Sequence, residues 1–326
     1  MALSKNLTIT KIAQQANVSI ATASRVINQS GAVKEETREK VLQAMKSLNY
    51  QNRESSSKYI LASFSDFQNP FNADLIRGIR SAASRRGYTL FLQQIDRPHS
   101  SEAYKFLLNE KIFSGVIFTH VVPDRNLLDA IRIQYPIVMC SEYSEVENIP
   151  FVVIDDFEAA QDAMKYLISI GKRRIALLNS SLDHNYAVQR EHGYRAALAE
   201  SNLPINERWM VHLTDIDFES ACSAVSNLLS SSERPDAFFC VSDVFASAVI
   251  KSASGLNLSV PQDVAVVGFD NVYLTTMTVP SITTVSQPTY QLGFQSANIL
   301  IDQIEGKPVL NYRVVLSTDL IVRGST

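Results

Sequence analysis

The chain has 326 residues, of which 46% are hydrophobic and 19% charged, so it is long enough for a small domain and a larger two-lobed one. It has no apolar run near the ~20 residues of a membrane helix, and its N-terminus lacks the pattern of a signal peptide. Three widely spaced cysteines indicate reduced thiols, so we expect a cytoplasmic protein without membrane contact.

Charge is unevenly distributed along the chain. Residues 1–58 contain nine Lys or Arg and four Glu, a net charge of +5, which leaves −8 for the remainder of the chain. A basic head on an acidic body fits nucleic-acid contact that is confined to the head.

The head has the periodicity of three helices, over about 9–16, 20–28 and 35–48. Asn17 suits a left-handed turn after the first helix, and Ser19 is a good N-cap for the second. In the third helix, four residues are expected on the buried side: Val41, Leu42, Met45 and Leu48. Two short helices joined by a tight turn, with a third as support, predict a helix-turn-helix.

The second helix carries the expected DNA-contacting face. Arg25 is the best candidate for a guanine contact, because its planar fork matches the O6/N7 acceptor pair. Other residues are better suited to phosphate contact and orientation. They are Ser19, Thr22, Ser24, Asn28 and Tyr50, with Thr8 as the candidate cap of the first helix. From periodicity alone, a solvated polar helix face remains the alternative.

The run T-I-T-K-I-A-Q-Q-A-N-V-S-I-A-T-A-S-R-V-I-N from Thr8 to Asn28 closely resembles the DNA-binding head of the lactose/galactose repressor family. The resemblance continues through the third helix to Tyr50. It implies that Ile20 and Ala21, the first two positions of the recognition helix, choose the operator. Both are apolar, so they can read only thymine methyl groups and DNA shape.

The linker departs from that family. Relatives carry a hinge helix whose leucine wedges into the minor groove, whereas residues 51–58 here read Q-N-R-E-S-S-S-K. A short, Ser-rich segment without this leucine is typical of a flexible tether. We therefore expect looser coupling between effector and DNA, or coupling through a partner protein.

From Tyr59 onward, apolar strands alternate with amphipathic helices in two successive runs, which predicts βαβ units and two doubly wound parallel sheets. This α/β body also resembles the family, through phrases such as Q-R-E-H-G-Y (189–194), V-V-G-F-D-N (266–271) and P-S-I-T-T-V-S-Q-P (280–288). The resemblance implies a periplasmic-binding-protein-like fold, and the last segments look most like the cytidine-repressor branch. The expected domains are a head (1–50), a linker (51–58) and an effector-binding and dimerisation body (59–326). Within the body we expect lobe 1 at about 59–155 and 285–315 and lobe 2 at about 156–284 and 316–326.

The resemblance also implies an effector site between the lobes. Arg190 falls where the family holds ligand hydroxyls or a ring, and Asp270 where it accepts from hydroxyls; a structural ion pair is the alternative for both. Gln287 and Asp155 match cleft positions less closely. Asn72 and Ile216 stand where some relatives have stacking aromatics, so Phe67, Phe71 or Phe218 would have to supply a ring. The expected effector is a nucleoside, a purine or a sugar.

Enzymes and solute-binding transport proteins share such two-lobed bodies, so both are alternatives. The sequence has no G-x-G pair, G-x-S-x-G, H-E-x-x-H or C-x-x-C, so we expect neither catalysis nor a cofactor or metal. A transport protein would need a signal peptide and would lack the basic head. The sequence thus predicts a DNA-binding repressor that binds a palindromic operator as a homodimer and responds to a small molecule.

Overall fold

The computed structural model describes residues 9–27, 33–48, 58–95, 101–109, 112–122, 125–144, 146 and 148–326. They form two compact units, residues 1–57 and 58–326, called here the head and the body. Most of the predicted linker, residues 51–57, lies outside the described residues. Three of the predicted DNA-contacting residues also lie outside them: Thr8, Asn28 and Tyr50.

The head contains three helices: α1 (Ile9–Gln15), α2 (Ile20–Ile27) and α3 (Glu35–Ser47). Asn17 has φ 53° in the turn between the first two, as its residue type predicts. Ser19 then caps α2, because its Oγ accepts a hydrogen bond from the backbone N–H of Thr22 at 3.1 Å. These features confirm the predicted helix-turn-helix.

One predicted core residue of the head is wrong. Leu42 is 50% exposed, whereas Val41 and Ala44 are buried against Ile12 and Val26. Adjacent helical residues point about 100° apart, so placing Val41 at the centre of the contact turns Leu42 away from it.

Lobe 1 of the body is built on a six-stranded parallel sheet with the order β11-β5-β4-β3-β1-β2. Helices α4 and α11 pack on one face and α5 and α6 on the other. The strands are β1 (Tyr59–Phe64), β2 (Thr89–Gln94), β3 (Gly115–Phe118), β4 (Ile137–Cys140), β5 (Phe151–Ile154) and β11 (Arg313–Leu316). The helices are α4 (Phe71–Arg85), the 3₁₀ turn Ser101–Tyr104, α5 (Lys105–Asn109), α6 (Arg125–Gln134) and α11 (Thr289–Ile304).

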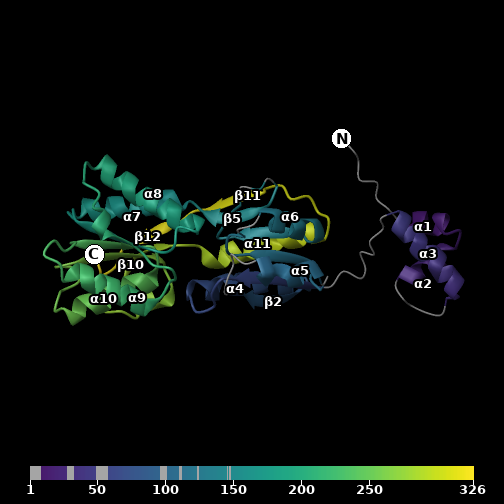
Figure 1. The fold of residues 1–326 in the computed structure, drawn as a ribbon, viewed down its shortest axis with the longest axis horizontal. Helices are drawn as coiled ribbons and strands as arrows, with labels where there is room; N and C mark the ends of the chain where they lie inside the picture. The colour runs from purple at the N-terminus through teal and green to yellow at the C-terminus, as the bar shows by residue number, and fades with distance from the viewer. Residues whose placement is uncertain are drawn as a thin grey trace. The chain divides into compact units, whose positions relative to one another are not determined.

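Lobe 2 repeats this plan with the order β12-β10-β9-β8-β6-β7, in which β12 alone pairs antiparallel. Helices α7 and α8 cover one face and α9 and α10 the other (Figure 1). The strands are β6 (Ile175–Asn179), β7 (Met210–His212), β8 (Ala237–Cys240), β9 (Ala265–Asp270), β10 (Thr283–Ser286) and β12 (Asp319–Ile321). The helices are α7 (Asp156–Ser169), α8 (Asn185–Glu200), α9 (Phe218–Leu229), α10 (Asp243–Gly255) and the 3₁₀ turns Glu207–Trp209 and Tyr273–Thr276.

The chain crosses between the lobes three times, at 154–156, 286–289 and 316–319. One continuous hydrophobic core includes buried residues of both lobes, such as Ile60 and Phe239. Both sheets share the doubly wound order 2-1-3-4-5, which confirms the predicted α/β body. In each sheet the topological switch point lies between the first and third strands, so ligands are expected at the carboxyl ends of β1 and β3 and of β6 and β8.

Candidate functional site

The outer face of α2 presents a mixed polar and apolar surface. Ile20 is 55% exposed, and Ala21 and Arg25 are also exposed. Thr22 and Ser24 are half-buried at the edges of this face. The opposite face buries Ala23, Val26 and Ile27 in the head, as the periodicity predicts. Packing therefore leaves the six predicted residues from Ser19 to Arg25 as the accessible side of the second helix.

In the body, a cavity of about 970 Å³ is bounded by both lobes. Part of its wall is formed by residues at the carboxyl ends of parallel strands. In lobe 1, Gln94 ends β2, and Ser65, Thr119 and Ser141 directly follow β1, β3 and β4. In lobe 2, Ser180, Val241 and Gln287 directly follow β6, β8 and β10. The cavity thus lies at the switch point of both sheets, where the topology places a ligand.

Arg190 on α8 is the central charged group of the cavity. Its Nε and Nη2 both contact Oδ1 of Asp156 at 2.8 Å, and its Nη1 donates to the carbonyl of Val241 at 2.6 Å. The guanidinium lies 3.5 Å from the ring centroid of Phe269, at the end of β9. These contacts hold Arg190 in place although it is almost fully buried, so it meets a ligand in a preformed orientation.

Asp270 ends β9 beside this arginine, with its Oδ1 4.0 Å from Nη1 of Arg190. Its backbone has φ 106°, a conformation rare for a residue with a side chain, which marks a strained position at a candidate site. Nε2 of Gln287 donates to Oδ1 of Asp270 at 2.7 Å. Burial raises the pKa of Asp270 to about 7 despite the arginine and the amide, so this carboxylate is costly to keep charged.

The structure brings together six of the seven predicted effector residues. The cavity is lined by Phe71, Asn72, Arg190, Ile216, Asp270 and Gln287. Asn72 is already engaged, since its Nδ2 donates to the carbonyl of Asp66 at 2.6 Å. Phe67 and Phe218 are not among the lining residues, which leaves Phe71 as the phenylalanine in the cavity wall.

Asp155 does not line this cavity. It is exposed, and its Oδ1 accepts from the backbone N–H of Glu158, so it caps α7. The next residue, Asp156, is the one that binds Arg190. An N-cap faces the first turn of its helix, and the one-residue step to Asp156 turns that carboxylate inward.

Two aromatic residues in the wall escaped the sequence reasoning. Tyr186 and His184 line the cavity, and their rings stack with centroids 5.2 Å apart. The guanidinium of Arg190 lies 4.9 Å from the centroid of the Tyr186 ring. Tyr186 precedes Arg190 by four residues on the same helix, and this i, i+4 spacing was a usable signal.

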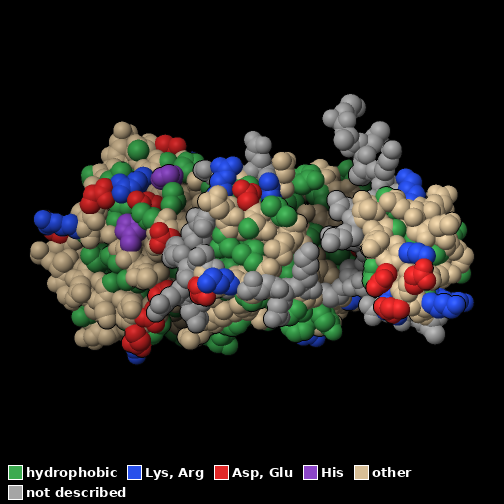
Figure 2. Space-filling view, turned by 45° about the vertical axis from the view of Figure 1, so that its right-hand side comes forward, with side chains coloured by type: hydrophobic (Ala, Val, Ile, Leu, Met, Phe, Trp, Pro, Cys, Tyr) green, Lys and Arg blue, Asp and Glu red, His purple; other side chains and the backbone are tan. Residues whose placement is uncertain are grey.

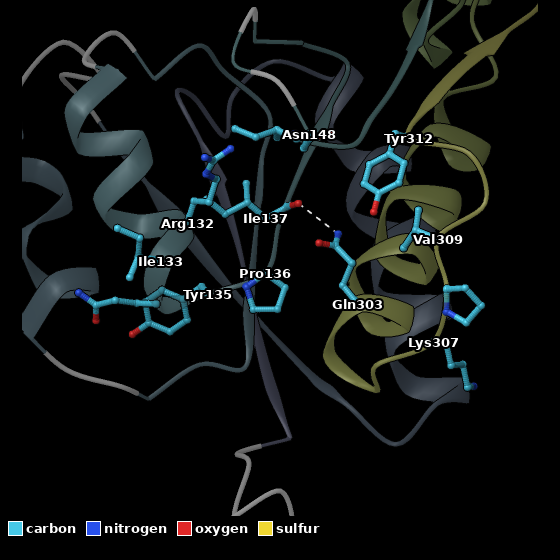
Figure 3. A pocket seen from close by; sticks show the side chains of 13 residues that line it. Arg132, Ile133, Tyr135, Pro136, Ile137, Asn148, Gln303, Lys307, Val309 and Tyr312 are labelled. Carbon is cyan, nitrogen blue, oxygen red and sulfur yellow. Dashed lines mark hydrogen bonds between the residues drawn. The ribbon is translucent and has the colours of Figure 1, made fainter. Parts of the chain in front are cut away.

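A second cavity of about 480 Å³ lies in lobe 1, at the ends of the strands opposite to those that line the first cavity (Figure 3). Pro136 and Tyr312 line it directly before β4 and β11, so it opens at the amino ends of the strands. Nε2 of Gln303 donates to the carbonyl of Ile137 at 3.2 Å and so ties α11 to β4 (Figure 3). Because ligands of doubly wound sheets bind at the carboxyl ends, we take the larger cavity as the candidate site.

Within the described residues, no helix is long and apolar enough to cross a membrane. The same residues contain no group of three or more His, Cys, Asp or Glu arranged to hold a metal ion. Cys140, Cys222 and Cys240 are free thiols.

Two family models match the chain: "Bacterial regulatory proteins, lacI family" over residues 8–52 and "Periplasmic binding protein-like domain" over residues 164–326. The ribose operon repressor of Halalkalibacterium halodurans is 35% identical, with 98% of this chain and 97% of that protein covered. The HTH-type transcriptional repressor CytR of Escherichia coli is 31% identical, with 98% and 96% covered. Identity therefore does not favour the cytidine-repressor branch over others.

Among solved structures, a transcriptional regulator CelR–cellobiose complex has a TM-score of 0.75 and 30% identity, and the match covers 98% of this chain and 100% of that one. Its coverage includes both the head and the body. The chain is therefore a DNA-binding transcription regulator that belongs to the lacI family of bacterial regulatory proteins.

Proposed function

We propose that this chain is a cytoplasmic, homodimeric repressor that binds a palindromic operator through α2 and is controlled by a sugar-like effector held between the lobes. The observation that carries the proposal is the cavity at both switch points, with a preformed Arg190–Asp270 pair, in a chain that also has a helix-turn-helix. We assign no catalytic step to the cavity.

The DNA contact is assigned to the exposed face of α2. Arg25 reads a guanine, Ile20 and Ala21 contact thymine methyl groups, and Ser19, Thr22 and Ser24 orient the helix on phosphates. Thr8, Asn28 and Tyr50 are included from the resemblance of the sequence alone. One head contributes few base contacts, which favours two heads on a two-fold symmetric site.

A polyhydroxylated effector is supported by the chemistry of the cavity wall. Arg190 donates, Asp270 and Gln287 accept, and five serines line the same space. The aromatic rings of the wall leave little room for stacking a base, because the ring of Tyr186 already contacts the ring of His184 and the guanidinium of Arg190. Phe71 is then the remaining ring, and a single ring suits the apolar face of a sugar. Two relatives carry sugar names, ribose and cellobiose.

Dimerisation is supported by exposed apolar side chains on the body. Strand β2 is an edge strand of the lobe 1 sheet, and Phe91 and Leu92 on it are each 43% exposed. In lobe 2, Tyr273, Met277 and Val279 are exposed around one 3₁₀ turn. Figure 2 shows apolar side chains among charged ones on the face turned to the viewer. An uncovered apolar edge strand is a liability that a two-fold partner would remove.

The DNA-binding part is tested by selecting duplexes from a random-sequence pool with the full-length protein. We expect enrichment of a palindrome, and binding to it that weakens steeply with salt. Arg25→Ala should weaken binding about 5- to 150-fold, as expected for one lost bidentate base contact. Lys40→Ala is the matched control, because Lys40 is exposed on α3 and paired with Glu36. Equal losses in both variants, or a selected site without two-fold symmetry, would contradict the assignment.

The effector part is tested by thermal-shift measurement with panels of sugars and nucleosides. A compound that binds only the folded body raises its melting temperature. We expect the hits among sugars, and their effect should disappear in Arg190→Gln. Hits confined to nucleosides would refute the sugar assignment and leave the DNA-binding assignment standing.

A further inference from the structure

The cavity between the lobes has an acidic wall. Among the described residues that line it, the acidic side chains are all aspartates, and Arg190 is the only Lys or Arg. The aspartates are Asp66, Asp183, Asp215, Asp217 and Asp270.

The charge of Arg190 is already balanced by a residue outside the wall. Both Nε and Nη2 of Arg190 bind Asp156, which does not line the cavity. Three of the wall aspartates accept from neutral donors rather than from cations. Asp66 accepts from the backbone amides of Gln68 and Asn69, and Asp217 from that of Ser220. Asp183 accepts from the hydroxyl of Ser181. The hydrogen bonds from Ser220 lower the pKa of Asp217, so this carboxylate stays ionised at neutral pH.

A buried acceptor in the wall also lacks a donor. Gln287 is 7% exposed and lines the cavity. Its Nε2 donates to Asp270, which fixes the orientation of the amide, and its buried Oε1 has no hydrogen-bond partner in the structure. An unsatisfied buried acceptor costs free energy, so the occupant of the cavity is expected to donate to it.

We propose that the effector is a sugar-like molecule that carries a protonated amino group and that phosphorylated sugars are rejected. This proposal rests on the function proposed above and specifies the ligand of the same site. A hydroxyl of the ligand donates to Oε1 of Gln287 beside Asp270, and the ammonium group faces the acidic wall at Asp215. A phosphate would meet this acidic wall without a spare cation to receive it. A bare divalent cation lacks a cage, because no three His, Cys, Asp or Glu side chains of the described residues are arranged to hold a metal ion.

The proposal is tested by calorimetry on the full-length protein with three matched sets of sugars. Each set contains a hexose, its 2-amino form and its 6-phosphate, built on glucose, galactose and mannose. We expect one amino sugar to bind at least about tenfold more tightly than its parent and its phosphate to show no binding. The preference should narrow between about 0.05 and about 0.5 M NaCl, because salt screens partly exposed charges.

Two variants separate the acidic wall from general charge effects. Asp215→Asn removes one wall carboxylate, whereas Glu219→Gln removes the same charge from an exposed position of α9 that does not line the cavity. Asp215→Asn should weaken binding of the amino sugar roughly two- to fivefold and leave the parent hexose unchanged. Glu219→Gln should change neither.

Each other outcome overturns the inference. Binding of a parent hexose or a phosphate as tightly as the amino sugar shows that the acidic wall does not select charge, while the sugar assignment stands. Absence of binding by all nine compounds overturns the amino-sugar proposal. If the same preparation still binds DNA in a salt-dependent manner, only the amino-sugar proposal is overturned and the DNA-binding function stands.

Discussion

Replacing Arg190 with glutamine removes the charged group on which the cavity is organised. The guanidinium binds Asp156 through two nitrogens and the carbonyl of Val241, and it lies 4.0 Å from Asp270. Only 5% of its side chain is exposed. Arg190→Gln therefore leaves two buried carboxylates without their cation.

Breaking a buried ion pair by removing one partner costs about 3–5 kcal/mol of the free energy of unfolding, because the remaining charge is buried without compensation. A matched control lies on the same helix. Arg195 pairs with Glu191 and Glu207 but is 33% exposed, so Arg195→Gln should cost about 1 kcal/mol or less. The contrast between two arginines of α8 separates burial from loss of charge.

The assay is urea unfolding followed by the fluorescence of Trp209, the single tryptophan of the chain, which lies in lobe 2 with Arg190. Burial raises the pKa of Asp156 and of Asp270, so both carboxylates take up protons as the pH falls. The penalty of Arg190→Gln should therefore be smaller at pH 5 than at pH 8. If Arg190→Gln is no more destabilising than Arg195→Gln at pH 8, or if its penalty grows in acid, the reasoning is refuted.

Three further predictions concern stability. Burial raises the pKa of Asp270 to about 7, so between about pH 4 and 7 the native state binds a proton that the unfolded state lacks. The free energy of unfolding then falls as pH rises through this window, and Asp270→Asn should flatten that fall in urea melts at pH 5 and 8. Gly293→Ala would place a Cβ 2.2 Å from the carbonyl oxygen of Leu75 and should lower the free energy of unfolding by about 1–3 kcal/mol. At Gly255 an added Cβ meets nothing within 4 Å, so Gly255→Ala should be neutral or stabilising. Thermal melts of the two variants test the contrast. Ser19→Ala removes the cap of α2 and should lower the free energy of local opening of this helix by about 1 kcal/mol, measured as faster hydrogen exchange of the α2 amides. Ser19→Asn should restore the protection.

The local features of this fold follow from the sequence because each has a short-range cause. The helices of the head and the βαβ alternation of the body are periodic patterns, and Asn17 and Ser19 have side chains suited to their turn and cap. The positions of Arg190, Asp270 and Gln287 came from resemblance, and the structure brings all three into one cavity wall.

Features that depend on tertiary contacts were not predicted from the sequence. Whether Val41 or Leu42 points inward depends on where α1 and α2 contact α3, which periodicity within one helix does not specify. The packing of α11 on α4 joins segments about two hundred residues apart. It requires glycine on both sides, since a Cβ at Gly78 would lie 2.1 Å from the carbonyl oxygen of Tyr290, just as one at Gly293 would meet Leu75. No local sequence pattern predicts that Gly78 and Gly293 form such a contact.

The contacts of the cavity give the effector a physical route to the orientation of the lobes. Gln287 lies in the crossing at 286–289 and Asp156 ends the crossing at 154–156, so two of the three connections between the lobes bind the Arg190–Asp270 pair directly. A ligand that donates to Gln287 would therefore contact one of the segments that join the lobes.

In lobe 1, one strand connects the cavity wall to the start of the body. Strand β1 begins at Tyr59, one residue after the body begins, and it ends directly before Ser65 in the cavity wall. It pairs with β2 and β3, and five of its six residues are buried, so it moves with the sheet as one element. We therefore expect any displacement of the lobe 1 wall to reach residue 58 at the start of the body. We expect coupling through this strand to need no hinge leucine, because the signal would be the position of the sheet itself.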